Sequence, residues 1–324
     1  MRRETEMESK RDLLSIDDFS PDEFKKIIDW AISAKQDDGL FEEFMPLTGL
    51  TIGSIYEKPS TRTRVSFEVG IDKLGGNPLT LLKGDIQLGK SESIEDTAAV
   101  LSRYLGAITY RCFGHEDVEK LANGSSVPVI NALSDKHHPC QAAADIMTIA
   151  ENFNELSEIK VAWVGDGNNV LHDLMLGAAA LGMEIHYAVP KGFEPDENIV
   201  SRANDIAKKT GGSVKMTHDP IEAVKDANVV YTDVFISMGE EHLKDKIEAF
   251  EGFQVNEELV ANADSEYIFM HCLPAHRGEE VTDGVIDSKN SVVFDQAENR
   301  MWAQMSLMTF LIHPVAWEAF AELN

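Results

Sequence analysis

The sequence predicts an α/β protein with two lobes, and three observations support this fold class. Short apolar runs suited to buried strands alternate with helical segments along most of the chain. With 324 residues, the chain is long enough for two domains. The polar segment 152–158 separates two series of strands and helices, and we place the domain boundary there. The expected strands are 50–56, 79–82, 107–111, 127–132, 159–167 with its glycine turn, 184–190, 213–217, 228–232, 267–272 and 292–295.

The composition argues against several classes of partner. The net charge of −27 leaves no basic surface to bind a nucleic-acid backbone. No apolar run approaches the length of a membrane span, and the charged N-terminal segment resembles neither a secretory signal nor a transit peptide. Three cysteines are too few for a disulfide framework and fit a reducing compartment. We therefore expect a cytoplasmic protein that acts on small molecules.

A group of anion-binding side chains follows the first strand. The next helix is expected at 65–74, with Phe67, Ile71 and Leu74 on one face and Gly75 at its end. Free backbone N–H groups and the helix dipole favour an anion at such a helix start. The alternative is an ordinary capped helix, but arginines this close together in so acidic a chain favour a phosphate site. The donors before the helix are Ser60, Thr61, Arg62 and Thr63.

Two further places in the first half could contribute donors. The strand 107–111 ends in Arg111, and carboxyl ends of strands are where open α/β sheets bind ligands. A surface ion pair is the alternative for this arginine. His138 and Gln141 precede a helix expected at 142–153, and the histidine could polarise a carbonyl group. No set of residues with zinc-ligand spacing accompanies them, so we expect no metal.

The second half begins with a strand–helix–strand unit that could bind a dinucleotide. Asn169 opens its helix, but Val170 occupies the place of the third glycine in the dinucleotide fingerprint. The next strand ends in Val189 and Pro190 rather than an acidic residue that could hold a ribose. The asparagine is better suited to a small zwitterion.

Later strand ends carry groups that suit an amino acid. Asp233 ends one strand and could bind an ammonium group, although a plain turn is the alternative. Cys272 lies where the next strand gives way to a loop, and spacing alone leaves core and catalytic roles open. Arg300 lies in the first turn of the terminal helix, where a cation is expected to face an anion. Together these groups predict a cleft that holds a phosphorylated donor against an amino acid.

Four motifs resemble those of the aspartate/ornithine carbamoyltransferase family, in the family's order and across nearly the whole chain. They are Ser60–Arg64, His138–Gln141, Asp233–Gly239 and His271–Pro274, and the last two are similar to the ornithine branch. Phe235 stands where that branch usually has Trp, and Cys140 replaces an aliphatic or Thr residue.

The resemblance implies two doubly wound parallel-sheet domains with an active-site cleft between them. A carbamoyl-phosphate-binding domain, 1–152, would be joined by the C-terminal helix 299–324, and 153–298 would bind L-ornithine. It further implies a homo-oligomer, either a trimer or an assembly of trimers.

The resemblance also assigns site residues. Catalytic roles fall to Arg62, Arg111, His138 and Cys272. Carbamoyl phosphate would bind Ser60, Thr61, Arg62, Thr63, Gln87, Arg111, His138, Gln141, Cys272, Leu273 and Arg300, with Gln87 reaching a neighbouring subunit. Ornithine would bind Asn169, Asp233, Ser237 and the backbone of Met238. Citrulline and phosphate would be the products, and no metal or organic cofactor is required because carbamoyl phosphate is already activated.

Other functions stay open at this stage. The acceptor could be putrescine, N-acetylornithine or lysine, and the reaction could serve arginine biosynthesis or catabolism. A nicotinamide-dependent oxidoreductase and an inactive homologue are the alternatives from other classes.

Overall fold

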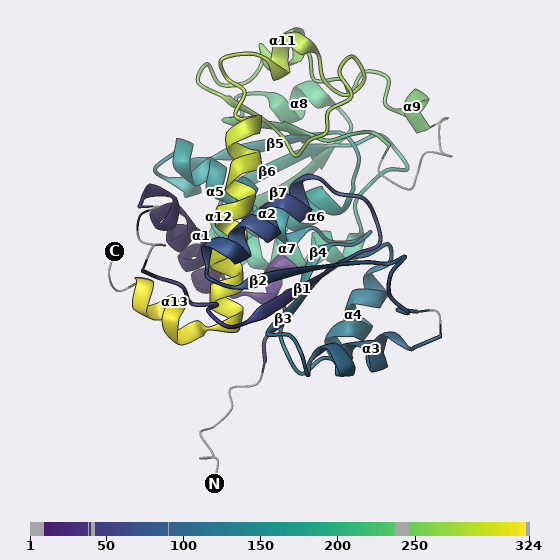
Figure 1. Cartoon of the computed structure of the whole chain (residues 1–324). Helices are drawn as coiled ribbons and strands as arrows, with labels where there is room; N and C mark the ends of the chain where they lie inside the picture. The colour runs from purple at the N-terminus through teal and green to yellow at the C-terminus, as the bar shows by residue number, and fades with distance from the viewer. Residues whose placement is uncertain (1–9, 38, 40–42, 90, 237–245, 322–324) are drawn as a thin grey trace.

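The strands form two sheets in which all neighbouring strands are parallel, as predicted (Figure 1). The computed structural model describes residues 10–37, 39, 43–89, 91–236 and 246–321. One sheet has the order β2-β1-β3-β4 and the other β7-β6-β5-β8-β9. Their bounds are β1 Thr51–Tyr56, β2 Asn77–Leu82, β3 Ala107–Arg111, β4 Val129–Leu133, β5 Lys160–Val164, β6 Glu184–Ala188, β7 Ser213–Thr217, β8 Val229–Thr232 and β9 Ile268–His271.

Helices cover both faces of the first sheet. Successive side chains of a strand point to opposite faces, so each strand contributes to two cores. Ile52 of β1 and Ile130 of β4 pack in the core that contains the helices α1, α2 and α5. Ile55 and Tyr110 pack on the other side, against α3 and α4. These helices are α1 Pro21–Gln36, α2 Arg62–Lys73, α3 Ile94–Leu101, α4 His115–Gly124 and α5 Pro139–Asn152.

The second sheet is covered in the same way. Val161 and Trp163 of β5 face the core that includes α6 and α7. Ala162 and Val164 face a separate core with α8, α10 and α11. The helices after α5 are η3 Leu156–Glu158, α6 Asn169–Ala180, α7 Glu197–Thr210, α8 Pro220–Val224, α9 Lys246–Ala249, α10 Glu257–Val260 and α11 Asp283–Ile286.

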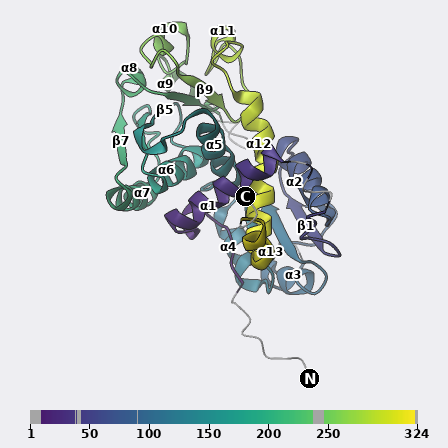
Figure 2. The same cartoon turned by 90° about the vertical axis from the view of Figure 1, so that its left-hand side faces the viewer.

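Helix α12, Val293–Ile312, joins the two lobes (Figure 2). It begins beside β9 and then packs against α5, α2 and α1 of the first lobe. A short helix, α13 Pro314–Ala321, follows it, because a proline starts a new helix more readily than it continues one. Arg300 lies on the part of α12 that faces the first lobe, where its guanidinium contacts Thr63 of α2.

The strand expected at 292–295 is wrong, because Val293 already begins α12. A single parallel bridge joins Ser291 to Phe269 of β9. The buried positions then follow a helical spacing through Val293, Gln296 and Arg300, while Phe294 is 75% exposed. The short apolar run is therefore the start of a helix. Periodicity alone does not distinguish a buried strand from a helix in a run of this length.

Two other differences concern helices. The segment 115–124 forms α4, which the sequence did not predict. Helix α2 begins at Arg62 rather than at residue 65, so this arginine lies in the first turn. Within the described ranges, no helix combines the length and apolar character needed to cross a bilayer.

Replacing Phe67 by Ala should destabilise the first lobe. The side chain is fully buried under α2, and such truncations cost about 3–5 kcal/mol. Asp72→Ala on the same helix is the control, since Asp72 is exposed and should change stability by less than about 0.5 kcal/mol. Urea unfolding followed by circular dichroism gives both values. Equal stability of the two variants would contradict this packing.

Candidate active site

A cavity of about 800 Å³ lies where the carboxyl ends of both sheets meet. This is the expected ligand position for open parallel sheets. Helix α12 adds one arginine to the wall. Twelve of the fifteen residues predicted for the site line this cavity: Ser60, Thr61, Arg62, Thr63, Arg111, His138, Gln141, Asn169, Asp233, Cys272, Leu273 and Arg300.

Three predicted residues are not placed in the cavity wall. Gln87 lies in the loop after β2, where its Oε1 accepts a hydrogen bond from Ser91 at 3.1 Å. It is not among the residues that line the cavity of its own chain. Ser237 and Met238 lie outside the described residues.

The start of α2 forms the floor on the first-lobe side. The backbone N–H of Thr63 donates to the Ser60 hydroxyl at 3.2 Å, which shapes the turn before the helix. Thr63 Oγ1 accepts from Arg111 Nη1 at 3.4 Å and from Arg300 Nη2 at 3.2 Å. One hydroxyl therefore holds two guanidinium groups from β3 and α12 beside a helix N-terminus, an arrangement that favours an anion.

Burial sets the charge state of this floor. Burial and the neighbouring Arg300 lower the pKa of Arg111 to about 10, so it is still a cation at neutral pH. Burial, followed by Arg300 and Arg111, holds the pKa of His138 well below its usual range. The imidazole is therefore neutral and can donate one N–H to a carbonyl oxygen. Its Nδ1 is buried without a hydrogen-bond partner among the described residues.

A buried carboxylate orients Gln141 behind the floor. Asp145 Oδ1 accepts from Gln141 Nε2 at 2.8 Å and from Gln296 Nε2 at 2.7 Å, and the Tyr231 hydroxyl donates to Oδ2 at 3.0 Å. This leaves Gln141 Oε1 to accept from Arg300 Nη1 at 2.6 Å. Sequence reasoning missed Asp145. Its position one helical turn after Gln141, on the buried face of α5, was the available signal.

The second lobe presents a carboxylate and a thiol to the cavity. Cys272 Sγ donates to Asp233 Oδ1 at 3.1 Å, and Asn168 Nδ2 donates to Asp233 Oδ2 at 2.8 Å. Burial and the adjacent Asp233 raise the pKa of Cys272 well above its usual value. The sulfur is therefore a thiol at neutral pH and acts as a hydrogen-bond donor rather than a nucleophile.

The sequence did not predict an ion pair that lies in the same wall. Lys246 Nζ lies 2.7 Å from Asp166 Oδ2, and the ammonium group lies 5.3 Å from the ring centroid of Phe193. Lys246 opens a four-residue helix and belongs to no motif, so no sequence signal points to it.

One set of possible metal ligands touches the site. Ligand atoms of Asp233, His271 and Cys272 lie within 4.8 Å of one another. His271 Nδ1 accepts from the backbone N–H of Leu273 at 2.9 Å, and its Nε2 lies 3.1 Å from Glu280 Oε1. Both ring nitrogens and the thiol therefore already have partners within the protein.

Two family models match this chain, one for each lobe. The model for the carbamoyl-phosphate-binding domain of aspartate/ornithine carbamoyltransferases matches residues 11–151, and the model for the Asp/Orn-binding domain matches 157–311. The chain belongs to the aspartate/ornithine carbamoyltransferase family. The predicted resemblance is thereby confirmed at the level of the family.

Individual carbamoyltransferases are similar over almost their full length. A catabolic ornithine carbamoyltransferase of Thermoplasma acidophilum is 52% identical over 305 residues, covering 94% of this chain and 99% of that protein. An anabolic one of Pyrococcus furiosus is 51% identical over 303 residues, covering 93% and 96%. The solved structure of an ornithine carbamoyltransferase from Pyrococcus furiosus has a TM-score of 0.91 at 50% identity, covering 94% and 97%.

The cysteines of this carbamoyltransferase-family chain should resist alkylation while it is folded. Burial raises the pKa of Cys112 and of Cys140 to about 12, and burial together with Asp233 raises the pKa of Cys272 well above its usual value. Thiolates react and thiols do not, so iodoacetamide at about pH 8 should label the native protein slowly and the urea-unfolded protein fast. Peptide mass spectrometry reports each site. Fast labelling of native Cys272 would show that its thiol is not protonated.

Proposed function

We propose that this chain transfers the carbamoyl group of carbamoyl phosphate to the side-chain amine of L-ornithine, giving L-citrulline and phosphate. The observation that carries the proposal is the shared cavity. The cations Arg62, Arg111 and Arg300 line it together with Asp233 and Cys272 of the other lobe. The names of the similar proteins support the same activity.

In this proposal the first lobe holds the phosphate and polarises the carbonyl. Ser60 to Thr63 bind phosphate oxygens at the α2 N-terminus, and Arg111 and Arg300 neutralise charge that grows on the leaving phosphate. Neutral His138 and Gln141 lie beside the same floor and complete the donor set. Preorganised donors of this kind can stabilise a transition state by about 3–4 kcal/mol each.

The second lobe presents the amine. Asp233 binds the α-ammonium group of ornithine, and Asn169, Ser237 and the Met238 backbone bind the remaining α-groups. The side-chain ammonium group gives one proton to water, and the resulting amine, oriented by Cys272 and Asp233, attacks the carbonyl carbon. The C–O bond to the phosphate breaks, and the leaving phosphate accepts the second proton from the nitrogen. The attack is direct, because the protonated Cys272 thiol is a poor nucleophile. Orientation across the cavity can lower the barrier by about 7–11 kcal/mol. Carbamoyl phosphate is activated already, so the reaction needs no metal or organic cofactor.

The domain division follows the substrates. We assign carbamoyl phosphate to 1–152 with the returning helix 299–324, and ornithine to 153–298. The packing of α12 against α2 and α5 supports this division, because these contacts attach the end of the chain to the first lobe.

The protein is proposed to work as a cytoplasmic homotrimer or an assembly of trimers. Apolar side chains on one edge of the first lobe support an interface between copies. Val65 and Val69 of α2 and Leu79 and Leu82 of β2 are each between 41% and 52% exposed. Gln87 lies just beyond this edge strand and outside its own cavity, as a residue that completes a neighbour's site would. Three free cysteines agree with a reducing cytoplasm.

The purified protein should form citrulline from carbamoyl phosphate and ornithine. Arg62→Ala should lower kcat/KM at least about a hundredfold, because it removes a cation from the phosphate site. Arg277→Ala is the matched control, since Arg277 pairs with Asp283 and Asp287 on the surface. Putrescine, N-acetylornithine and lysine are assayed in parallel for ureido products. No citrulline from the wild type, or near-normal activity of Arg62→Ala, would refute the proposal.

Mixed oligomers should reveal whether Gln87 completes a neighbour's site. Arg62→Ala and Gln87→Ala are each expected to be nearly inactive alone. If the glutamine acts in the neighbouring site, subunits dissociated and reassembled together should recover roughly a quarter of wild-type activity through random pairing. Reassembly of each variant with itself is the control. Native mass spectrometry shows whether the subunits have exchanged. If they have exchanged and the mixture recovers no activity, Gln87 acts in the site of its own subunit or in no site.

A further inference from the structure

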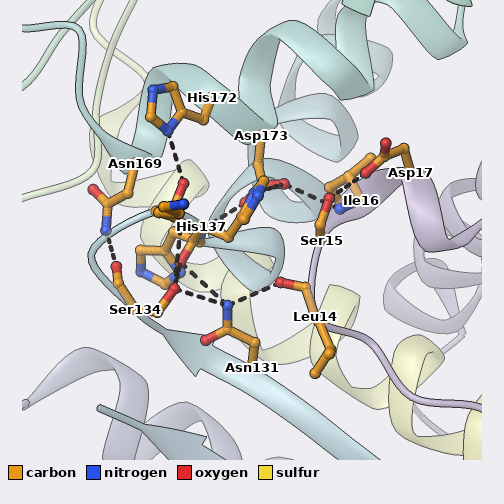
Figure 3. A network of polar contacts seen from close by, with 12 residues as sticks. Leu14, Ser15, Ile16, Asp17, Asn131, Ser134, His137, Asn169, His172 and Asp173 are labelled. Carbon is orange, nitrogen blue, oxygen red and sulfur yellow. Dashed lines mark hydrogen bonds and ion pairs between the residues drawn. The ribbon is translucent and has the colours of Figure 1, made fainter. Parts of the chain in front are cut away.

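One face of α6 holds the backbone of the loop that carries His138 (Figure 3). The loop, residues 134–138, joins β4 to α5. Asn169 Nδ2 donates to Ser134 O at 2.6 Å, and His172 Nδ1 donates to Lys136 O at 2.8 Å. Asn169, His172 and Asp173 have the i, i+3, i+4 spacing that places side chains on one helix face. Side chains of the second lobe therefore fix a loop of the first.

We call the contact between this face of α6 and residues 134–138 the junction, and Asp173 lies at its centre. It is fully buried, and its Oδ2 accepts from the backbone N–H of His138 at 2.5 Å. Its Oδ1 accepts from the backbone N–H of Ile16 at 3.0 Å and contacts His137 Nδ1 at 3.1 Å. A buried carboxylate is tolerated only when donors of this kind surround it. The carboxylate therefore joins the N-terminal segment, the loop and α6 at one point.

The neighbouring histidines complete the junction. The His137 carbonyl accepts from the backbone N–H of Ser134 at 2.9 Å, so its main chain belongs to the loop while its ring faces Asp173. Burial works against protonation of His137, but Asp173 outweighs it and raises the pKa of the ring. Burial lowers the pKa of His172. Its neutral ring can thus donate from Nδ1 while Nε2 accepts from the backbone N–H of Asp196 at 3.0 Å.

The position of the His138 ring depends on its backbone. His138 is the residue before the first turn of α5, with φ −137° and ψ 62°, and its side chain makes no capping hydrogen bond. Ring Nδ1 also lacks a partner among the described residues. The backbone bond to Asp173 is therefore the polar contact that ties this residue to the second lobe, next to Asn169 of the acceptor side.

We propose that Asp173 is a positioning residue for carbamoyl transfer. By bonding to the His138 backbone, it holds the ring within hydrogen-bonding distance of the substrate carbonyl. The inference rests on the proposed function, because His138 acts there as a donor. The phosphate site at residues 60–63 has no contact with this junction among the hydrogen bonds of the described chain. Loss of the junction should therefore affect kcat more than the binding of carbamoyl phosphate.

Asp173→Asn tests this role with nearly the same side-chain shape. One amide oxygen cannot serve all three donors, so the loop and the His138 ring should shift. We expect kcat for citrulline formation to fall about ten- to a hundredfold, since a displacement of about 1 Å can cost this much. The KM for carbamoyl phosphate should change less than about twofold, because the phosphate-binding residues 60–63 do not bond to the junction. Leu176→Ala on α6 is the control for lost stability, as Leu176 is buried and does not bond to the loop.

A double-mutant cycle separates positioning from a general structural effect. If Asp173 acts through His138, Asp173→Asn should change kcat less than about twofold in a His138→Ala background. An equal loss in both backgrounds, or an equal loss in Leu176→Ala, would overturn the proposal. If the wild-type protein forms no citrulline, the proposed function is wrong, and the role of Asp173 in carbamoyl transfer is refuted with it.

His137 gives a second route if Asp173→Asn does not fold. His137→Gln keeps an N–H donor toward Asp173, whereas His137→Phe removes it. We expect the first to retain most of kcat and the second to lose it in the same His138-dependent way. Equal activity of these two folded variants, checked by circular dichroism, would contradict a positioning role for the junction.

Discussion

Two buried guanidinium groups, those of Arg111 and Arg300, donate to the same hydroxyl of Thr63, and the site is built around this pair. Like charges at close range disfavour each other, most strongly where water is excluded. Burial lowers the pKa of both groups, and a neighbouring arginine adds to the effect, Arg300 for Arg111 and Arg62 for Arg300. An anionic substrate removes the repulsion when it binds. Burial keeps His138 neutral and the same pair adds to this effect, so the buried arginines favour both an anionic ligand and an uncharged hydrogen-bond donor.

Two buried carboxylates support this floor from behind, each in a different way. Asp145 orients Gln141, which in turn fixes Arg300. Asp173 accepts a hydrogen bond from the backbone N–H of His138 and is not among the residues that line the cavity. Both lie at places where helices of the two lobes meet, since α5 packs against α6 and α12. The positions of His138 and Arg300, the donors in the proposed reaction, are therefore coupled to how the lobes pack as well as to the segments that carry them.

The sequence could predict groups that lie at strand ends and helix starts, because parallel sheets bring those places together regardless of the loops between them. Arg111, Asp233 and Cys272 were found in this way. For Asp145 it offered only the spacing from Gln141, and for Asp173 it offered no signal, since each carboxylate gains its role from contacts with partners distant in sequence. The strand expected at 292–295 was wrong for a related reason. A run of four residues is too short to distinguish the period of a strand from that of a helix. Only the packing of the segment against β9 and the first lobe decides between the two.

The acidic surface has little influence on the binding of an anion in such a site. A net charge of −27 repels carbamoyl phosphate at long range, whereas a positively charged protein would attract it. At physiological salt the Debye length is roughly 8 Å, so this repulsion is largely screened outside the cavity. Inside it, the buried arginines are screened much less and determine the local potential. Affinity for the anion is therefore a property of a few desolvated groups, and the surface charge is free to differ without changing the chemistry of the cavity.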